Sequence, residues 1–151
     1  ALADYYNQTG QQPQALTLYQ KYITLRPDDA RARVTLAELL IGSGNLAGAQ
    51  SQLVQAISFA SATTDPQTTA RAHLDLGDVY TALQPPRQND ALTEYTQASN
   101  LDPSGAIGDQ ARTKLAALQQ QLNVATVTVV APSAPASGAA GTPLARPTGT
   151  P

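Results

Sequence analysis

Cysteine, methionine and tryptophan are absent from this chain of 151 residues, which has only one phenylalanine and one histidine. Without cysteine the chain forms no disulfide, offers no thiol nucleophile and lacks the ligands of most structural zinc sites. The missing methionine includes the first position, so we expect a processed protein or a piece of a longer one. These absences exclude three kinds of site and leave the cellular compartment open.

Charge is also scarce, since 13% of the residues are charged and the net charge is -2. The sequence therefore has no basic stripe for the phosphates of a nucleic acid and no polybasic patch for an anionic membrane surface. Its apolar runs are far shorter than the roughly 20 residues that a membrane-spanning helix needs. We expect neither a nucleic-acid partner nor membrane insertion.

The residues that could carry catalysis or bind a metal form no convincing pattern. His73 has no partner in the sequence that would complete a triad, so we interpret it as a packed or edge residue. Gly42-Ser43-Gly44 follows an expected helix rather than a strand, which is typical of a turn and not of a phosphate loop. Asp28 and Asp29 suit the capped start of a helix better than a cation site. We predict no enzymatic activity, no cofactor and no metal site.

A threefold repeat is the main feature that the sequence does have. Its first triplet recurs after 34 residues and again after 40 more: Leu2, Ala3 and Tyr6, then Leu36, Ala37 and Leu40, then Leu76, Gly77 and Tyr80. A second set follows each triplet: Ala15 with Tyr19, Ala49 with Leu53 and Ala56, and Ala91 with Tyr95 and Ala98. A period near 34 with two apolar helical patterns per unit predicts an α-helical solenoid, whose units bury their apolar faces against one another.

Turn and cap residues mark the ends of the expected helices. Gly10 ends a helix over residues 1–9, and Pro13 fits the first turn of the next helix, which ends before Pro27. After the second unit, residues 58–69 add six residues to the period and predict a longer helix or an edge loop. The turn over residues 85–90 is two residues longer than its counterparts.

These positions together resemble the tetratricopeptide repeat family. The pattern is small residues at Ala3, Ala37 and Gly77, large ones at Tyr6, Leu40 and Tyr80, small ones at Ala15, Ala49 and Ala91, and closing prolines at Pro27 and Pro103. The resemblance implies an all-α solenoid of antiparallel helix pairs over residues 1–122, with repeats at about 1–29, 30–69 and 70–103. The chain departs from the pattern at Tyr22, where a small residue is usual, at Ser61, which replaces a closing proline, and at His73, where a bulky aromatic is common.

The two ends of this solenoid differ in the sequence. Residues 104–122 predict an amphipathic helix, with an apolar stripe from Ile107 to Leu122, that caps the last repeat. No comparable helix precedes Leu2 and Tyr6. We therefore expect either further residues or another molecule to cover the N-terminal end.

The resemblance also implies a peptide or helix bound on the concave face, which the first helix of each repeat lines. The equivalent positions here are Asp4, Asn7, Gln8, Arg31, Val34, Glu38, Ile41, Arg71, Leu74, Asp78 and Thr81. Their acids and arginines allow two interpretations: they grip a polar peptide, or they pair with one another between adjacent repeats. Some family members hold the C-terminal carboxylate of a chaperone with basic and amide side chains, but Asp4, Thr35 and Asp75 stand at those places, so that ligand is not expected.

The composition changes after residue 122. Residues 124–130 alternate partly like a β-strand, and residues 131–151 are Ala, Pro, Ser, Gly and Thr, with Leu144 and the single charge of Arg146. We expect an extended low-complexity tail over residues 123–151, either a linker or stalk, or a segment that adds to another molecule. The tail composition and the triplet Asn7-Gln8-Thr9 are compatible with a glycan on Asn7 or on the tail, and with a location outside the cytoplasm or on the cell surface.

Two functions remain open from the sequence. In the first, the chain is a non-enzymatic scaffold or adaptor that binds a protein or peptide on its concave face. In the second, copies of the chain self-assemble into a polymer or surface filament, through Leu2 and Tyr6 of the open end or Val127 and Val129 of the tail.

Overall fold

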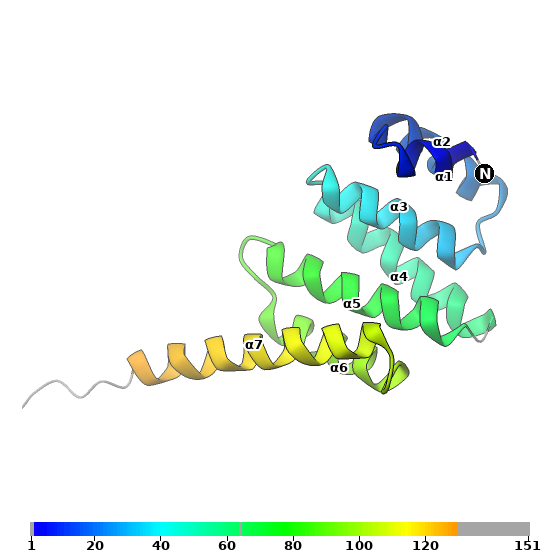
Figure 1. The fold of residues 1–151 in the computed structure, drawn as a ribbon. Helices are drawn as coiled ribbons and strands as arrows, with labels where there is room; N and C mark the ends of the chain where they lie inside the picture. Colours follow the sequence, from blue (N-terminus) through cyan, green and yellow to red (C-terminus); the bar gives the residue numbers. More distant parts are fainter. Residues whose placement is uncertain (1, 64, 130–151) are drawn as a thin grey trace, which may run out of the picture.

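The computed structural model describes residues 2–63 and 65–129, and of residues 61–63 and 124–129 it describes the backbone alone. These parts form seven α-helices (Figure 1). The helices are α1 (Leu2–Gln8), α2 (Gln12–Leu25), α3 (Ala30–Gly42), α4 (Leu46–Thr63), α5 (Pro66–Ala82), α6 (Gln88–Leu101) and α7 (Ala106–Val129). The predicted all-α class is confirmed. None of the helices in the described parts is long and apolar enough to cross a bilayer.

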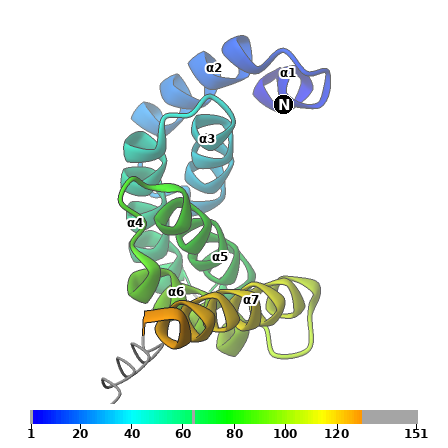
Figure 2. The ribbon, with the colours of Figure 1, turned by 90° about the vertical axis from the view of Figure 1, so that its left-hand side faces the viewer.

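The helices stack as consecutive pairs, and each helix contacts the next one along the chain. The first helices of successive pairs also contact each other at α3 and α5 and at α5 and α7. Figure 2 shows the result as an arch, with α2 and α4 on its outer side and α3 and α5 on its inner side. This arrangement confirms the antiparallel helix-pair solenoid and places the inner helices where a concave face was expected.

Local sequence features explain where the helices begin and end. Gly10 and Gly44 adopt φ values of 76° and 79°, in the left-handed region that glycine enters without strain, and both lie in turns between paired helices. Asp29 and Asp65 cap α3 and α5, because their side chains accept hydrogen bonds from the backbone N–H groups of Ala32 (3.0 Å) and Thr68 (3.1 Å). The predicted cap at Asp29 is therefore confirmed.

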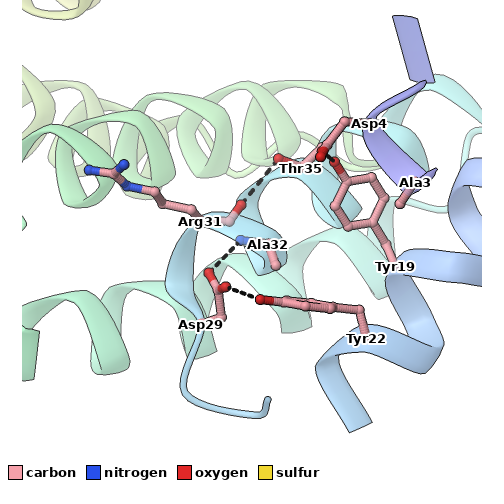
Figure 3. A pocket seen from close by; sticks show the side chains of 8 residues that line it. All are labelled: Ala3, Asp4, Tyr19, Tyr22, Asp29, Arg31, Ala32 and Thr35. Atoms are coloured by element: carbon pink, nitrogen blue, oxygen red, sulfur yellow. Dashed lines mark hydrogen bonds between the residues drawn. The ribbon is translucent and has the colours of Figure 1, made fainter. Parts of the chain in front are cut away.

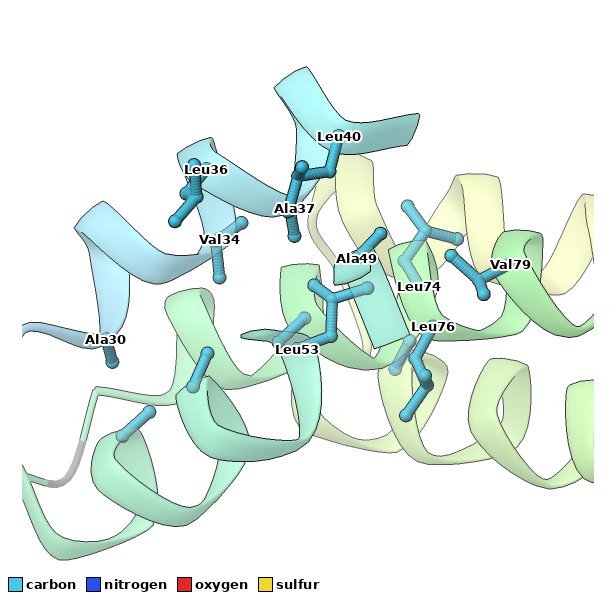
Figure 4. Close-up of a cluster of buried hydrophobic side chains, with 14 of the residues drawn as sticks. Ala30, Val34, Leu36, Ala37, Leu40, Ala49, Leu53, Leu74, Leu76 and Val79 are labelled. Atoms are coloured by element: carbon cyan, nitrogen blue, oxygen red, sulfur yellow. The ribbon is translucent and has the colours of Figure 1, made fainter. Parts of the chain in front are cut away.

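The repeated small and large residues form one continuous core (Figure 4). Ala15, Ala37, Ala49 and Ala91 are fully buried, so the backbones of neighbouring helices approach closely at these points. The large residues of the pattern fill the space between them, and Leu53 is fully buried as well. Close packing of this kind is what holds a solenoid together, because no single helix pair can bury its own apolar face.

The structure differs from the sequence predictions at two places. The first is the start of α5 at Pro66, four residues before the expected start of the third repeat, whereas the lengthening of α4 to Thr63 is one of the two outcomes predicted for the extra residues. At the other end, α7 continues to Val129, so residues 124–129 are helical and the predicted strand is wrong there. A helix satisfies its backbone groups within itself, whereas β-branched residues favour a strand only where a neighbouring strand supplies partners. The rest of the predicted tail, residues 130–151, lies outside the described residues.

Candidate functional site

A groove of about 360 Å³ lies between α3, α5 and α7 on the inner side of the arch. It is lined by Arg31, Val34, Thr35, Glu38, Gln67, Thr68, Arg71 and Ile107. The inner helices therefore provide a surface that is mixed in character, with two arginines and one glutamate beside apolar side chains.

Ion pairs cross this inner face from one repeat to the next. Arg71 on α5 lies 2.7 Å from Glu38 on α3, and Lys114 on α7 lies 2.7 Å from Asp78 on α5. Asp78 also accepts a hydrogen bond of 2.8 Å from the Tyr95 hydroxyl. These contacts agree with the interpretation that acids and bases of adjacent repeats pair with one another. Because the charged partners are more than a third exposed, each pair stabilises the fold by less than about 1 kcal/mol.

Arg31 turns away from the acids of the inner face and binds the start of α5. Its Nη2 atom lies 2.7 Å from the Asp65 carboxylate, and its Nε donates to the same oxygen at 2.8 Å. The Arg31 side chain remains 76% exposed, whereas that of Asp65 is 22% exposed.

Asp75 lies below this face with a side chain that is only 8% exposed. Burial raises the pKa of its carboxyl to about 6, although the Arg71 guanidinium at 3.2 Å acts in the opposite direction. The negative charges of Glu38 and Asp78 raise the pKa further. The inner face therefore contains a carboxyl group that changes its charge close to neutral pH.

A second cavity, of about 270 Å³, lies between α1, α2 and the start of α3 (Figure 3). Its lining consists of Ala3, Asp4, Tyr19, Tyr22, Asp29, Arg31, Ala32 and Thr35. The Tyr19 hydroxyl donates to the Asp4 carboxylate, and the Tyr22 hydroxyl donates to Asp29 at 2.8 Å. Because Arg31 and Thr35 line both hollows, the cavity and the groove adjoin.

Only some of the residues expected on the concave face line the cavity or the groove. Asp4 lines the cavity, Arg31 lines the cavity and the groove, and Val34, Glu38 and Arg71 line the groove. Leu74 is 2% exposed and belongs to the core, which corrects its assignment to the binding face.

The other expected positions have mainly local roles. Ile41 packs against the core, and Thr81 donates a hydrogen bond of 2.8 Å to the backbone carbonyl of Asp78. Asn7 and Gln8 lie in the last turn of α1. Sequence reasoning missed Tyr22 as a lining residue, although its departure from the repeat pattern was a signal.

The N-terminal end presents an apolar hollow of about 440 Å³ between α1 and α2. It is lined by Leu2, Tyr6, Pro13, Gln14, Thr17 and Leu18. Leu2 and the neighbouring Tyr5 are each 57% exposed. The two tail candidates, Val127 and Val129, lie in the last turn of α7, and their side chains are outside the described residues.

His73, the single histidine of the chain, lies between α5 and α6. Its Nδ1 atom is 2.6 Å from a carboxylate oxygen of Glu94, and both side chains are mostly buried. Within residues 2–63 and 65–129, no group of three or more His, Asp or Glu side chains could hold a metal ion.

Comparison with known proteins assigns the fold. The model of the family described as tetratricopeptide repeat matches residues 8–63. The first TPR domain of Spaghetti (RPAP3), solved with the HSP90 peptide SRMEEVD, superimposes with a TM-score of 0.68 at 20% identity, covering 80% of this chain and 87% of that one. BtubC (BKLC) from P. vanneervenii gives a TM-score of 0.61 at 13% identity, covering 96% of this chain and 68% of that one.

No curated protein matches the chain, and the family model that matches is not that of an enzyme. The match to the family model begins at the last residue of α1 and runs through α2, α3 and α4, a stretch that supplies six of the eight residues that line the cavity and half of those that line the groove. The solved structures extend the same fold to the later helices. Residues 8–63 match the tetratricopeptide repeat family, and the described helices share the fold of solved TPR domains.

Proposed function

We propose that the chain is a non-enzymatic scaffold or adaptor that binds a peptide or helix of a partner protein on its concave face. The family generally provides protein–protein interaction modules. The observation that carries the proposal is the continuous hollow surface on the inner helices, where the groove and the cavity share Arg31 and Thr35. The likeness to a TPR domain solved with a bound peptide supports the same mode of binding.

The charges of the inner face argue against a strongly acidic peptide. Five carboxylates lie along it or at its edge, on Asp4, Asp29, Glu38, Asp65 and Asp78, whereas its described residues include three cations, Arg31, Arg71 and Lys114. Juxtaposed like charges disfavour a partner. We therefore propose a neutral or basic peptide and do not transfer the acidic peptide of the RPAP3 structure to this chain.

Selection from a random peptide library tests this function. Thr35→Tyr places a bulky neutral side chain where the groove and the cavity meet, and Ser51→Tyr makes the same change on the exposed side of α4. We expect selected peptides to bind the wild type and Ser51→Tyr alike and to bind Thr35→Tyr at least about tenfold more weakly. Equal binding to both variants, or a library that yields no binding peptide, would refute the proposal.

A second candidate is a self-assembling structural subunit of a polymer or surface filament. The exposed Leu2 and Tyr5 and the apolar hollow beside them favour it, because apolar patches of this kind commonly mark interaction sites. The outer face of α7 is polar, with Gln110, Gln119 and Gln120 exposed, so the two ends of the solenoid differ in character. A contact from the N-terminal end of one copy to a different surface of the next propagates into a filament where the rotation between copies does not close into a ring.

Sedimentation of the full chain distinguishes this second candidate from the first. Leu2→Glu introduces a charge at the apolar end, and Val54→Glu introduces the same charge on α4, where Val54 is 49% exposed. Assembly through the N-terminal end predicts that Leu2→Glu abolishes the rapidly sedimenting species and that Val54→Glu does not. Removal of residues 130–151 tests the contribution of the tail in the same assay. A wild type that sediments as a monomer at every concentration would exclude assembly.

A further inference from the structure

The cavity between α1, α2 and α3 exists because the first repeat packs differently from the others. Among the described helices α1 contacts only α2, whereas α3 contacts α5 and α5 contacts α7. The inner helix of the first repeat therefore stands apart from the inner helix of the second. The space between them is the cavity, and Figure 3 shows side chains from all three helices around it.

Tyr22 contributes to the same space from α2. The corresponding residues of the second and third repeats, Ala56 and Ala98, are fully buried between closely packed helices. The larger Tyr22 side chain is instead 40% exposed, and its hydroxyl reaches across to Asp29 at the start of α3. With the buried Tyr19, it gives the cavity two aromatic walls, while Ala3 and Ala32 keep the lining small elsewhere.

The charges around the cavity favour a cation. The carboxylates of Asp4 and Asp29 lie at the ends of the two tyrosine side chains (Figure 3). Arg31, the one cation among the described residues of the lining, directs its guanidinium to Asp65 on α5 and so away from the cavity. Asp4 already interacts with the amino group of the chain's N-terminus, so Asp29 is the carboxylate on which binding of a further cation depends. A carboxylate can accept about four hydrogen bonds. Asp29 accepts one from Tyr22 and one from the Ala32 backbone, so it has capacity for another donor.

The tyrosines stay neutral beside these carboxylates. Burial raises the pKa of Tyr19, and its hydrogen bond to Asp4 raises it further. The pKa of Tyr22 is raised mainly by its hydrogen bond to Asp29. Neutral phenol rings attract ammonium and guanidinium groups through their faces.

The size of the cavity suits a single side chain. Its volume of about 270 Å³ is below the range of roughly 300–1,000 Å³ that is typical of pockets for drug-sized molecules. We infer that this cavity binds one basic side chain, a lysine or an arginine, of a peptide that continues into the adjoining groove. The inference rests on the proposed function, because the peptide presents the side chain.

Single amino-acid probes test the cavity directly. N-acetyl-arginine methylamide and N-acetyl-lysine methylamide carry the cation, and N-acetyl-citrulline methylamide is the neutral counterpart of the arginine probe. Each is titrated into the isotope-labelled full chain at a salt concentration of about 50 mM, where screening is weak. We expect at least one basic probe to shift the backbone amide signals of Ala32 and Thr35, and the citrulline probe to leave them in place. Equal shifts with citrulline, or none with either cation, would overturn the inference.

Two neighbouring aspartates provide a matched pair of variants. Asp29→Asn removes a charge from the cavity while asparagine still caps α3, and Asp28→Asn removes the same charge one residue outside the lining. We expect Asp29→Asn to lower the affinity for the basic probe at least about fivefold and Asp28→Asn to change this affinity by less than about twofold. If both variants weaken the probe equally, general attraction to an acidic surface explains the binding and the cavity does not.

The probe and the peptide library fail independently. If the library yields binding peptides but the basic probes do not bind, the inference about the cavity is refuted and the proposed function stands. If the probes bind with the expected response to Asp29→Asn but the library yields no binding peptide, the cavity is supported as a site for basic side chains and the proposed function is refuted.

Discussion

Gly77 on α5 lies directly against the ring of Tyr95 on α6. A Cβ atom placed on Gly77 would lie 2.5 Å from the Cε1 atom of Tyr95 and 2.7 Å from its Cδ1 atom. The ring is not free to move away, because Tyr95 is 3% exposed and its hydroxyl donates to Asp78, which Lys114 also binds. The small residue of the third repeat is therefore required by the position of one tyrosine.

Gly77→Ala is expected to destabilise the fold by about 1–3 kcal/mol, because the added methyl group overpacks the contact with Tyr95. Helix propensity alone predicts the opposite, since alanine is favoured over glycine by about 1 kcal/mol inside a helix. Gly42→Ala is the control, because the nearest atoms to its Cβ are those of the Gln12 side chain, 3.9 Å away. Urea unfolding should show Gly42→Ala to be neutral or slightly stabilising. A Gly77→Ala protein as stable as the wild type would show that the ring can shift.

The repeated residues made most of the fold predictable from the sequence. Small residues such as Ala37 and Gly77 recur with large ones such as Tyr95 at helical spacing, and such a pattern has few solutions other than stacked helix pairs. The cap at Asp29 was predictable for the same reason, because capping depends on residues that are close in sequence.

The candidate site was less predictable, because it depends on where the repeats deviate. The partner of Arg31 is Asp65, which reaches it because α5 starts at Pro66, and a repeat pattern carries no information on how an insertion folds. Residue equivalence also placed Leu74 on the binding face, although it is buried. The cavity depends on the separation of α1 from α3, and Tyr22 alone pointed to it in the sequence.

The cap of α5 allows a prediction about Asp65. Its carboxylate accepts from the Thr68 backbone at 3.1 Å and from the Thr68 hydroxyl at 2.8 Å, and it also binds Arg31. Asp65→Ala should cost about 1–2 kcal/mol of stability. Asp65→Asn keeps the oxygen that caps α5 and loses the second carboxylate oxygen, which pairs with the exposed Arg31 and accepts from the Thr68 hydroxyl, so it should cost less than Asp65→Ala.

The effect of Asp65 should also depend on pH. The hydrogen bonds from Thr68, with help from Arg31, hold the pKa of Asp65 below its ordinary value. The stabilisation is therefore present above the pKa of the unfolded chain and is lost as the pH falls through the folded value. The unfolding temperatures of the wild type and of Asp65→Ala should therefore approach each other in strong acid, as thermal unfolding can measure. A difference that stays constant with pH would contradict this account.

Arg33 provides a test of buried polar contacts on the outer side of α3. The residue is 6% exposed, and its guanidinium donates to the Pro27 carbonyl and to Gln52, each at 2.8 Å, with the Phe59 ring 5.1 Å away. Arg33→Ala should cost about 2–4 kcal/mol, because it removes the packed volume of a buried side chain and leaves two part-buried acceptors without their donor. Arg26→Ala, at an exposed arginine, should change the unfolding free energy by less than about 0.5 kcal/mol. Similar losses for the two variants would show that the buried contacts contribute little.

Asp75 should make the stability of the whole array depend on pH near neutrality. Its pKa is raised from the ordinary 3.8 to about 6, chiefly by burial. A raised acid pKa stabilises the fold below the unfolded value, and this contribution is lost as the pH rises through the folded value. Wild type should therefore lose stability between about pH 4 and pH 6, by up to about 3 kcal/mol for a shift of this size.

Asp75→Asn removes this titration and keeps a polar side chain of the same shape beside Arg71. The free energy of unfolding of the variant should therefore rise relative to that of the wild type as the pH rises from 4 to 7. Urea unfolding at a series of pH values measures this difference in free energy directly. Carboxyl-carbon NMR of the wild type should place the midpoint of the Asp75 titration near 6, as its burial requires. Unfolding curves of the two proteins that run parallel from pH 4 to pH 7 would mean that water reaches the Asp75 carboxylate in the folded chain.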